Sequence, residues 1–200
     1  VNGNSVTVSG GTIGNTVYGG YVESGIVNGN SVTVSGGTIG NTVYGGCAFN
    51  GSVTSNTVIV NGGTIGNTYG GTVFGGYVSS GSATSNTVTL CGGTIVNGSI
   101  YGGYSNTSSG DITTGNTLNL GSSGHGVSKL NAIKNIANFQ NLNFYLPSSI
   151  VNGDSVLTLS DATANTILGS SGANANISAY LDADTTLASG SKINLINKTG

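Results

Sequence analysis

An exact internal repeat constrains the fold of this 200-residue chain more than any other feature of its sequence. Residues 1–20 recur without a change as residues 27–46. Fixed periods of about 20 to 50 residues are typical of proteins in which one structural unit stacks on the next. Glycine pairs extend the pattern at intervals of 26, 26 and 30 residues, as Gly10-Gly11, Gly36-Gly37, Gly62-Gly63 and Gly92-Gly93. The chain is therefore expected to form a stack of similar turns.

Apolar and polar residues alternate within each unit, which indicates β-strands. Val6 and Val8, for example, flank Thr7, and this alternation of β-branched residues favours a strand over a helix. Three such runs, separated by glycine or asparagine, lie at residues 5–9, 12–18 and 21–27. The sequence predicts an all-β fold, a parallel β-helix (β-solenoid) with about 26 residues and three short strands per turn.

Stacked turns place equivalent residues in columns about 4.8 Å apart, so the members of a column must be able to contact one another. Three columns are apolar and are expected to point inward, and a fourth is aromatic. They consist of Val6, Val32, Val58, Val88 and Leu118; of Val8, Val34, Val60, Leu90 and Leu120; of Ile13, Ile39, Ile65 and Ile95; and of Tyr18, Tyr44, Phe74 and Tyr101.

Asparagine forms two further columns. An asparagine amide can donate to the side-chain carbonyl of the next turn and accept from the previous one. We therefore predict a hydrogen-bonded structural ladder in each column. The first consists of Asn4, Asn30, Asn56, Asn86 and Asn116, and the second of Asn15, Asn41, Asn67 and Asn97.

One insertion interrupts the period. The third interval is 30 residues long because four residues, Tyr69, Gly70, Gly71 and Thr72, precede the Val-Phe-Gly-Gly element that resumes the pattern. We expect them to bulge outward as a loop. Because loops break the repeat and often carry binding residues, these four residues are the candidate adhesive site, and residues 105–109 form a second candidate loop.

The repeats lose their regularity after residue 126. We assign residues 1–126 to regular β-helix turns and residues 127–200 to a less regular continuation in the same domain. Residues 128–138 favour a further strand but also fit a short helix or a turn. About three more turns are predicted from the alternating runs at residues 139–147, 155–159, 175–181 and 192–196.

Charge excludes one class of function. The chain has four lysines, no arginine and six carboxylates, giving a formal net charge of −2. A nucleic-acid binder needs clustered basic residues, so nucleic acid is not an expected partner. No apolar run is long enough to span a membrane, so membrane insertion by these residues is not expected. Because the chain opens at Val1, we expect it to be a piece of a longer protein.

The sequence offers few groups for catalysis or metal binding. Glu23 is isolated in the repeats and cannot form an acid–base pair by itself. Asp182 and Asp184 would share one face of a strand, where they could bind calcium or act as a pair. His125 lies between glycines in an expected loop. We predict no catalytic residue, no cofactor and no metal site.

The two cysteines are predicted to be free thiols. Cys47 and Cys91 belong to different columns in turns two apart. Their expected axial separation of roughly 7 to 10 Å, with a sideways offset added, exceeds the reach of a disulfide.

The repeat units also resemble a known family. The Asn-x-Val-Thr-Val-x-Gly-Gly-Thr-Ile unit and the Val-Tyr-Gly-Gly-Tyr unit, followed by residues 116–120 and 139–147, resemble passenger regions of Gram-negative autotransporter adhesins. The resemblance implies a right-handed parallel β-helix, exported by type V secretion through the outer membrane. It also implies a location at the bacterial cell surface or outside the cell, with the translocating barrel beyond Gly200.

These observations lead us to expect a non-catalytic surface adhesin or rigid stalk. Its partner would be a protein or glycan on a host or neighbouring cell, while a spacer that binds nothing remains open. End-to-end or edge self-association is also expected, because a β-helix exposes strand edges at its ends. A β-helical carbohydrate-active enzyme or tailspike is one alternative. Another is an ice-binding solenoid, which would use the outward columns Ser5, Ser31, Thr57, Thr87, Thr117 and Thr7, Thr33, Ile59, Thr89, Asn119.

Overall fold

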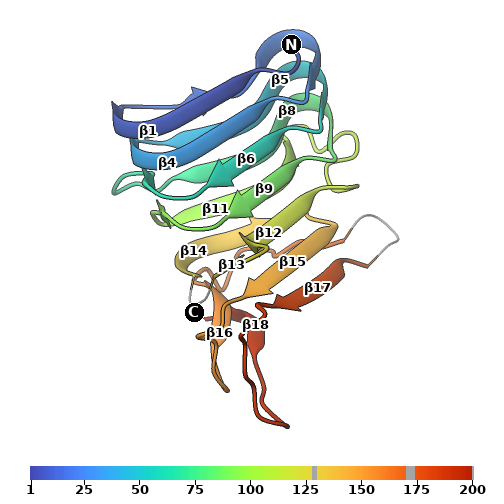
Figure 1. Ribbon diagram of the computed structural model, residues 1–200. Helices are drawn as coiled ribbons and strands as arrows, with labels where there is room; N and C mark the ends of the chain where they lie inside the picture. The colour runs from blue at the N-terminus through green and yellow to red at the C-terminus, as the bar shows by residue number, and fades with distance from the viewer. Residues whose placement is uncertain (128–129, 170–173, 200) are drawn as a thin grey trace.

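The computed structural model describes residues 1–127, 130–169 and 174–199 and shows a parallel β-solenoid (Figure 1). The described chain contains no helix, and so none that could cross a membrane. Its strands are β1 (Ser5–Ile13), β2 (Val17–Tyr18), β3 (Tyr21–Asn28), β4 (Ser31–Ile39), β5 (Thr42–Thr54), β6 (Thr57–Val60), β7 (Thr64–Ile65), β8 (Thr72–Thr84), β9 (Thr87–Leu90), β10 (Thr94–Ile95), β11 (Gly98–Ser105), β12 (Thr117–Ser122), β13 (His125–Gly126), β14 (Leu130–Ala137), β15 (Asn141–Leu146), β16 (Ser155–Leu159), β17 (Asn176–Leu181) and β18 (Asn194–Lys198).

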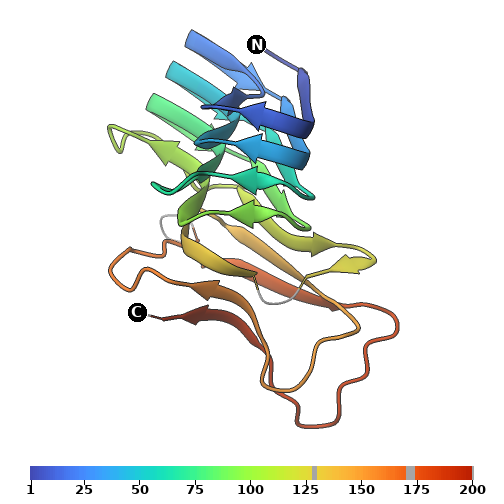
Figure 2. The ribbon, with the colours of Figure 1, turned by 90° about the vertical axis from the view of Figure 1, so that its left-hand side faces the viewer.

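The strands form two sheets that face each other across the core (Figures 1 and 2). One sheet runs through β4, β6, β9, β12, β15 and β17, with β1 paired to β4. The other runs through β5, β8, β11, β14, β16 and β18, with β2 and β3 paired to β5. Pairing along both paths is parallel, and each turn crosses from one sheet to the other. The predicted fold class is confirmed.

The number of strands in a turn varies. The first turn contains three strands, as predicted, although β1 already joins the first run to the start of the second; in the second turn the counterparts of β2 and β3 are one strand, β5. About five regular turns are followed by two wider levels, β15 with β16 and β17 with β18, instead of the three further turns expected. Along the asparagine ladder of the regular turns, hydrogen-bonded residues lie 26 or 30 positions apart, whereas Asn141 and Asn176 of β15 and β17 lie 35 apart.

The predicted inward columns form the core. Val32 pairs with Val58 and Val58 with Val88, and all three side chains are completely buried. A buried valine or leucine contributes about 1.5 to 3 kcal/mol, so each turn gains stability from its own members of the columns. A second, smaller cluster lies at the far end of the β5 and β8 strands and consists of Val27, Ala48, Val53, Val78 and Ala83.

The glycine pairs form the corners that follow the first strand run of each turn. The second glycine of each pair has a positive φ, between 73° and 78°, at Gly11, Gly37, Gly63 and Gly93. Residues with a side chain rarely adopt this backbone conformation, which explains why glycine recurs at every one of these corners.

The second half continues as strands. The helix considered for residues 128–138 is wrong, because residues 130–137 form β14, which pairs with β11 and β16; residues 128 and 129 lie outside the described part. Ile133 and Ile136 are buried in the core, although β14 is a strand and not a helix. His125 also differs from the expectation, since it lies in β13 and pairs antiparallel with the end of β12.

Candidate functional site

The first asparagine column is a buried hydrogen-bonded ladder, as predicted. From Asn4 to Asn116, the Nδ2 of each residue donates to the Oδ1 of the next at 2.9, 2.9, 3.1 and 3.3 Å. The same Oδ1 atoms accept the backbone N–H of the preceding asparagine at 2.8 to 3.0 Å. Because Asn30, Asn56 and Asn86 are nearly or completely buried, these bonds satisfy amides that water cannot reach.

A column of glycines makes room for this ladder. A methyl group at Gly20, Gly46, Gly76 or Gly103 would lie 2.5 to 2.8 Å from the Nδ2 of the neighbouring asparagine. Real side chains do not approach so closely, so each turn needs glycine opposite its asparagine. The Val-Tyr-Gly-Gly-Tyr unit therefore has a packing role.

Aromatic residues stack on the outer side of the same unit. The ring centroids of Tyr18, Tyr44, Phe74 and Tyr101 lie 4.9 to 5.1 Å apart in succession, with interplanar angles of 3° to 14°. A second column meets the first edge to face, and its Tyr77 and Tyr104 rings stack at 5.6 Å. The ring faces between turns are thus covered by one another and are closed to a ligand.

Cys47 occupies a position in the second aromatic column, between Tyr21 and Tyr77. Burial raises the pKa of its thiol to about 11. Burial, followed by the neighbouring Tyr18 and Cys47, also raises the pKa of Tyr44. Cys47 and Cys91 are both free thiols. A buried thiol that keeps its proton is a poor nucleophile, so Cys47 acts as a packing residue.

The second predicted asparagine ladder does not extend along its column. Asn41 donates to Asn15 at 3.4 Å, and both side chains are exposed. Asn67 instead accepts the backbone N–H of Tyr69 at 2.8 Å, and Asn97 adopts a positive φ of 44°. The inserted loop changes the backbone path at this point, which breaks the column that sequence alignment suggested.

The inserted loop projects from the solenoid at Tyr69, whose side chain is 95% exposed. Its base is tight, because Gly70 N–H bonds to Asn67 O at 2.9 Å and Gly71 N–H to Val96 O at 2.8 Å. Thr72 lies outside the loop, as the first residue of β8, where it pairs with Thr42. The structure therefore brings three of the four candidate residues into one loop with Tyr69 at its tip.

The second candidate loop, residues 105–109, begins inside the molecule. Ser105 is 6% exposed, and its Oγ is buried without a hydrogen-bond partner in the described structure. Thr107 and Ser109 are exposed and share a hydroxyl hydrogen bond of 2.6 Å. Only the later residues of this segment can contact a partner.

Four of the six carboxylates stabilise local structure. Glu23 accepts a hydrogen bond from the Tyr21 hydroxyl at 3.2 Å, and Asp154 accepts one from the backbone N–H of Val151. Asp111 and Asp161 each accept two backbone N–H groups of the following turn. At Asp111 burial raises the pKa, but hydrogen bonds from Thr114 and Thr113 outweigh it and lower the pKa overall. At Asp161 the hydrogen bonds, first that of the Thr163 hydroxyl, lower the pKa.

Asp182 and Asp184 have a different setting. They do not lie on a strand, because β17 ends at Leu181 and the chain turns there, with Thr185 N–H bonded to Asp182 O at 2.9 Å. Both nevertheless line one cleft of about 600 Å³. Tyr145 and Tyr180 line the same cleft, and their rings stack at 4.9 Å.

The sequence contained a signal for this pair of tyrosines. Residues 141–146 and 176–181 carry tyrosine at the same place before a leucine, and the structure pairs them residue for residue. The 35-residue interval differs from the regular period and hid this relation. In the described residues, no group of three or more His, Cys, Asp or Glu side chains could hold a metal ion.

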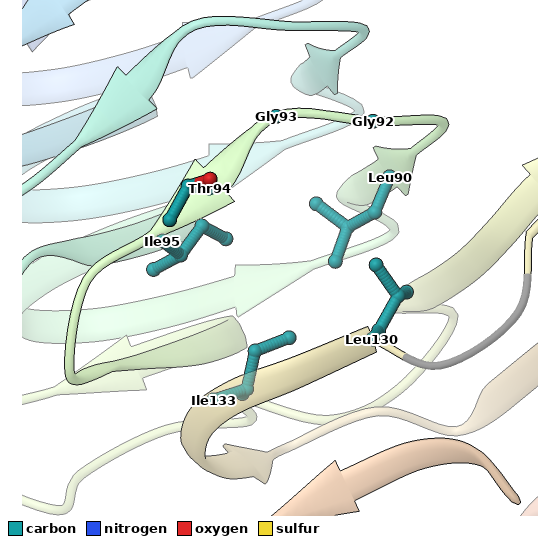
Figure 3. A pocket seen from close by; sticks show the side chains of 7 residues that line it. All are labelled: Leu90, Gly92, Gly93, Thr94, Ile95, Leu130 and Ile133. Atoms are coloured by element: carbon teal, nitrogen blue, oxygen red, sulfur yellow. The ribbon is translucent and has the colours of Figure 1, made fainter.

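A smaller cavity of about 240 Å³ lies where the regular turns end (Figure 3). The side chains of Leu90, Ile95, Leu130 and Ile133 converge on it. It forms because β10 ends its branch of the sheet, while the next turn makes the β12–β13 hairpin. Gly92, Gly93 and Thr94 complete its lining, and no charged side chain takes part, so we assign the cavity to packing.

Searches for similar proteins gave no match to a family model, to a curated protein or to a solved structure. The geometry of the chain itself therefore carries the functional argument.

Proposed function

We propose that this chain is part of a non-catalytic bacterial surface adhesin or stalk of the autotransporter passenger type, located at the cell surface or outside the cell. The residue pattern of the repeats supports the family assignment. The parallel solenoid supports it as well, since such a rod can hold a binding surface at a distance from its attachment point.

Rigidity supports a role as a rod. The buried ladder and the stacked rings connect every regular turn to the next by specific contacts. Buried polar networks in which every member is satisfied oppose alternative arrangements of the backbone. A stiff rod transmits force and position, as both an adhesin and a stalk require.

The observation that carries the adhesive form of the proposal is the loop tip at Tyr69. Its side chain is 95% exposed, whereas the most exposed residues of the stacked aromatic columns, Tyr18 and Tyr21, reach 42% and 47%. Tyrosine offers a large contact area at a low entropic cost, and it is frequent among the residues that dominate binding interfaces. Its partner would be a protein or glycan on a host or neighbouring cell.

Deletion of residues 69–72 tests the adhesive form. The chain then passes from Thr68 to Val73, and Thr68 takes the place that Thr72 holds at the start of β8. We expect binding of the purified protein to host cells to fall, with far-UV circular dichroism unchanged. Tyr69→Ser should reproduce the loss if the side chain makes the contact. Unchanged binding by both variants would rule out this loop, and no binding by the original protein would favour a spacer.

A second candidate, ice binding, has one specific observation in its favour. The outward hydroxyl columns are in exact register, with Thr7 opposite Thr33 and Thr57 opposite Thr87. Ile59 interrupts one column, and in the lower turns Asn119 and Asn143 join by a side-chain hydrogen bond of 2.8 Å. Thermal hysteresis above the buffer baseline would support this function, and its absence would end it.

Self-association would use the ends of the rod. In the described structure β1 and β3 pair on one side only, and β17 and β18 end their sheets at the other end. Unpaired edges can accept a strand from another copy. Sedimentation velocity over a wide concentration range should then show growing species, and a monomer at every concentration would contradict this proposal.

A further inference from the structure

The cleft near the end of β17 has the properties of a ligand site. It lies where β12, β15 and β17 end, beside the turn at the tip of the β12–β13 hairpin. Its volume of about 600 Å³ lies within the usual range of small-molecule sites, about 300 to 1,000 Å³. The polar side chains that line it are Ser123, Tyr145, Ser148, Tyr180, Asp182 and Asp184.

Backbone hydrogen bonds fix the walls of this cleft. Val127 N–H bonds to Tyr145 O at 2.9 Å, which holds the hairpin against β15. Asp182 N–H bonds to Leu146 O at 3.1 Å, which sets the start of the turn after β17. Gly121 allows the close approach of the hairpin, since a methyl group there would lie 2.9 Å from the Cβ of Tyr145. These contacts fix the backbone on two sides of the cleft, and a fixed backbone lowers the entropic cost of binding.

The carboxylates of the cleft differ from the other carboxylates of the chain. Glu23, Asp111 and Asp161 all accept hydrogen bonds that stabilise nearby structure. Within the described residues, neither Asp182 nor Asp184 has a side-chain hydrogen bond or an ion pair. Their acceptor oxygens are consequently available to a ligand, and local folding gives them no other role.

The tyrosine pair supplies an aromatic surface next to these acceptors. Tyr180 lies on β17, the last strand of its sheet, and its side chain is 47% exposed. Tyr145 is its ring partner on one side, and no described ring stacks on the other side. Unlike the rings inside the long stack, Tyr180 has one face that no described ring covers, and it lines the same cleft as the carboxylates.

The lining disfavours anionic ligands and favours a ligand with hydrogen-bond donors. Carboxylates only accept hydrogen bonds, so the ligand must bring donors. No basic side chain lines the cleft, so an anionic ligand would leave its charge unpaired. A pyranose sugar carries hydroxyl donors on its rim and an apolar C–H face that can lie on an aromatic ring. We infer that this cleft binds a neutral saccharide of one or two sugar units, with Tyr180 beneath the sugar ring and Asp182 and Asp184 accepting its hydroxyls.

The saccharide would be a ligand for the proposed surface function, bound at a site away from the Tyr69 loop. The biological role of this binding rests on the proposed function, whereas the binding itself does not. The cleft can be tested in solution, without cells.

Titration of isotope-labelled protein with neutral methyl pyranosides, followed by NMR, tests the inference directly. At least one sugar should shift backbone amide signals of residues 180–184 with saturation, whereas glucuronate should not. Tyr180→Ala should weaken binding about three- to tenfold, the range of one lost aromatic contact. The double variant Asp182→Asn with Asp184→Asn keeps the shape of the side chains and should weaken it further.

Phe49→Ala is the matched control, because it removes an exposed aromatic side chain outside the cleft and should leave sugar binding unchanged. No saturable shift with any neutral sugar up to millimolar concentrations would overturn the inference. A response to Ca²⁺ alone that the double variant abolishes would also overturn it. Circular dichroism of each variant confirms that the fold is intact.

The two proposals fail in different ways. If deletion of residues 69–72 abolishes cell binding and no sugar binds the purified protein, the loop stands as the adhesive site and the cleft is rejected as a sugar site. If sugars bind but the protein does not adhere to cells, the cleft stands as a sugar site and the adhesive role of the loop is rejected.

Discussion

The regular turns and the last turns share a parallel register but place their asparagines differently. In the regular turns the ladder from Asn30 to Asn116 lies inside the molecule and is sealed from water. In the last turns the asparagines stand on the outer face of the sheet, where Asn176 donates to Asn141 at 3.0 Å in an exposed position. The donor–acceptor distances are similar in both places. Only in the buried ladder does the bond satisfy amide groups that water cannot reach.

The interior changes where the ladder ends. Asn116 donates to the backbone carbonyl of Asn138 instead of another side chain. The next residue, Phe139, is completely buried, as is Phe144. The polar ladder needs glycine opposite each asparagine, and at the transition Gly102 leaves room for both Asn116 and Phe139. The comparison teaches that the recurring asparagine and its glycine belong to the ladder, whereas the solenoid itself continues without them.

Hydrogen exchange should show the largest difference between the two regions. β5 and β8 are flanked by strands on both sides and contain many buried residues, whereas most of β17 is exposed. We expect amides of β5 and β8 to exchange only through global unfolding and those of β17 through local opening at a much lower free energy. Exchange followed by NMR or mass spectrometry checks this order. Equal protection would show that the two regions unfold as one unit.

Replacing one asparagine in each region should separate their energetics. Asn56→Ala removes the acceptor for two donors of Asn30 and leaves the carbonyls of Val27 and Thr54 without their donor. At about 1 to 3 kcal/mol for each buried group left unpaired, we expect a loss of at least about 3 kcal/mol. Asn176→Ala should cost less than about 0.5 kcal/mol, because water replaces its exposed bond. Urea unfolding measures both, and similar losses would contradict the comparison.

The glycine wall can be tested at one position. Gly46→Ala places a methyl group 2.7 Å from the Nδ2 of Asn56 and 2.8 Å from a methyl of Val53. Overpacking of this kind costs typically about 1 to 3 kcal/mol. Gly14→Ala is the control, since nothing lies within 4 Å of its added methyl and its φ is not positive. A thermal melt that shifts equally in both variants would show that the ladder tolerates a bulkier wall.

Alkaline pH should weaken the regular turns through Cys47. Its thiol has an ordinary pKa of 9.0 that burial raises to about 11. Between these values the unfolded chain releases the proton and the folded chain retains it, so stability falls as pH rises. Urea midpoints measured from pH 8 to pH 11 should decline, and Cys47→Ser should decline less steeply. An identical slope in the variant would assign the effect to the tyrosines, among which burial also raises the pKa of Tyr44.

Much of the regular half was predictable because one repeat unit specifies strands, corners and columns together. The pairing of Val32 with Val58 and the positive φ of Gly37 both follow from the period. The second asparagine column failed at Asn67, because alignment of identical letters says nothing about how an inserted loop redirects the backbone. The arrangement in two sheets, instead of three separate short strands in every turn, could not be predicted from the pattern either, because runs that glycine separates in the sequence can join in one strand.

The cleft could be anticipated only in part. Asp182 and Asp184 attracted interest as a pair, but the reason was wrong, because they follow β17 rather than lie on it. Their meeting with Tyr145 depends on the 35-residue turn and on the hairpin that closes the cleft. Such long-range contacts arise from loop lengths and packing, which local patterns do not determine.

The smallest predicted effect concerns Ser105, which continues a buried column otherwise occupied by Val78 and Ala48. Its hydroxyl is buried without a partner in the described structure. Removing such a group relieves its desolvation cost, so Ser105→Ala should be neutral or stabilise by up to about 1 kcal/mol. Ser82→Ala is the matched control, because its hydroxyl accepts the backbone N–H of Asp111 at 3.1 Å and its loss should destabilise. A clear destabilisation by Ser105→Ala in urea would show that the hydroxyl has a partner in solution, and would place ordered water where the regular core meets the later turns.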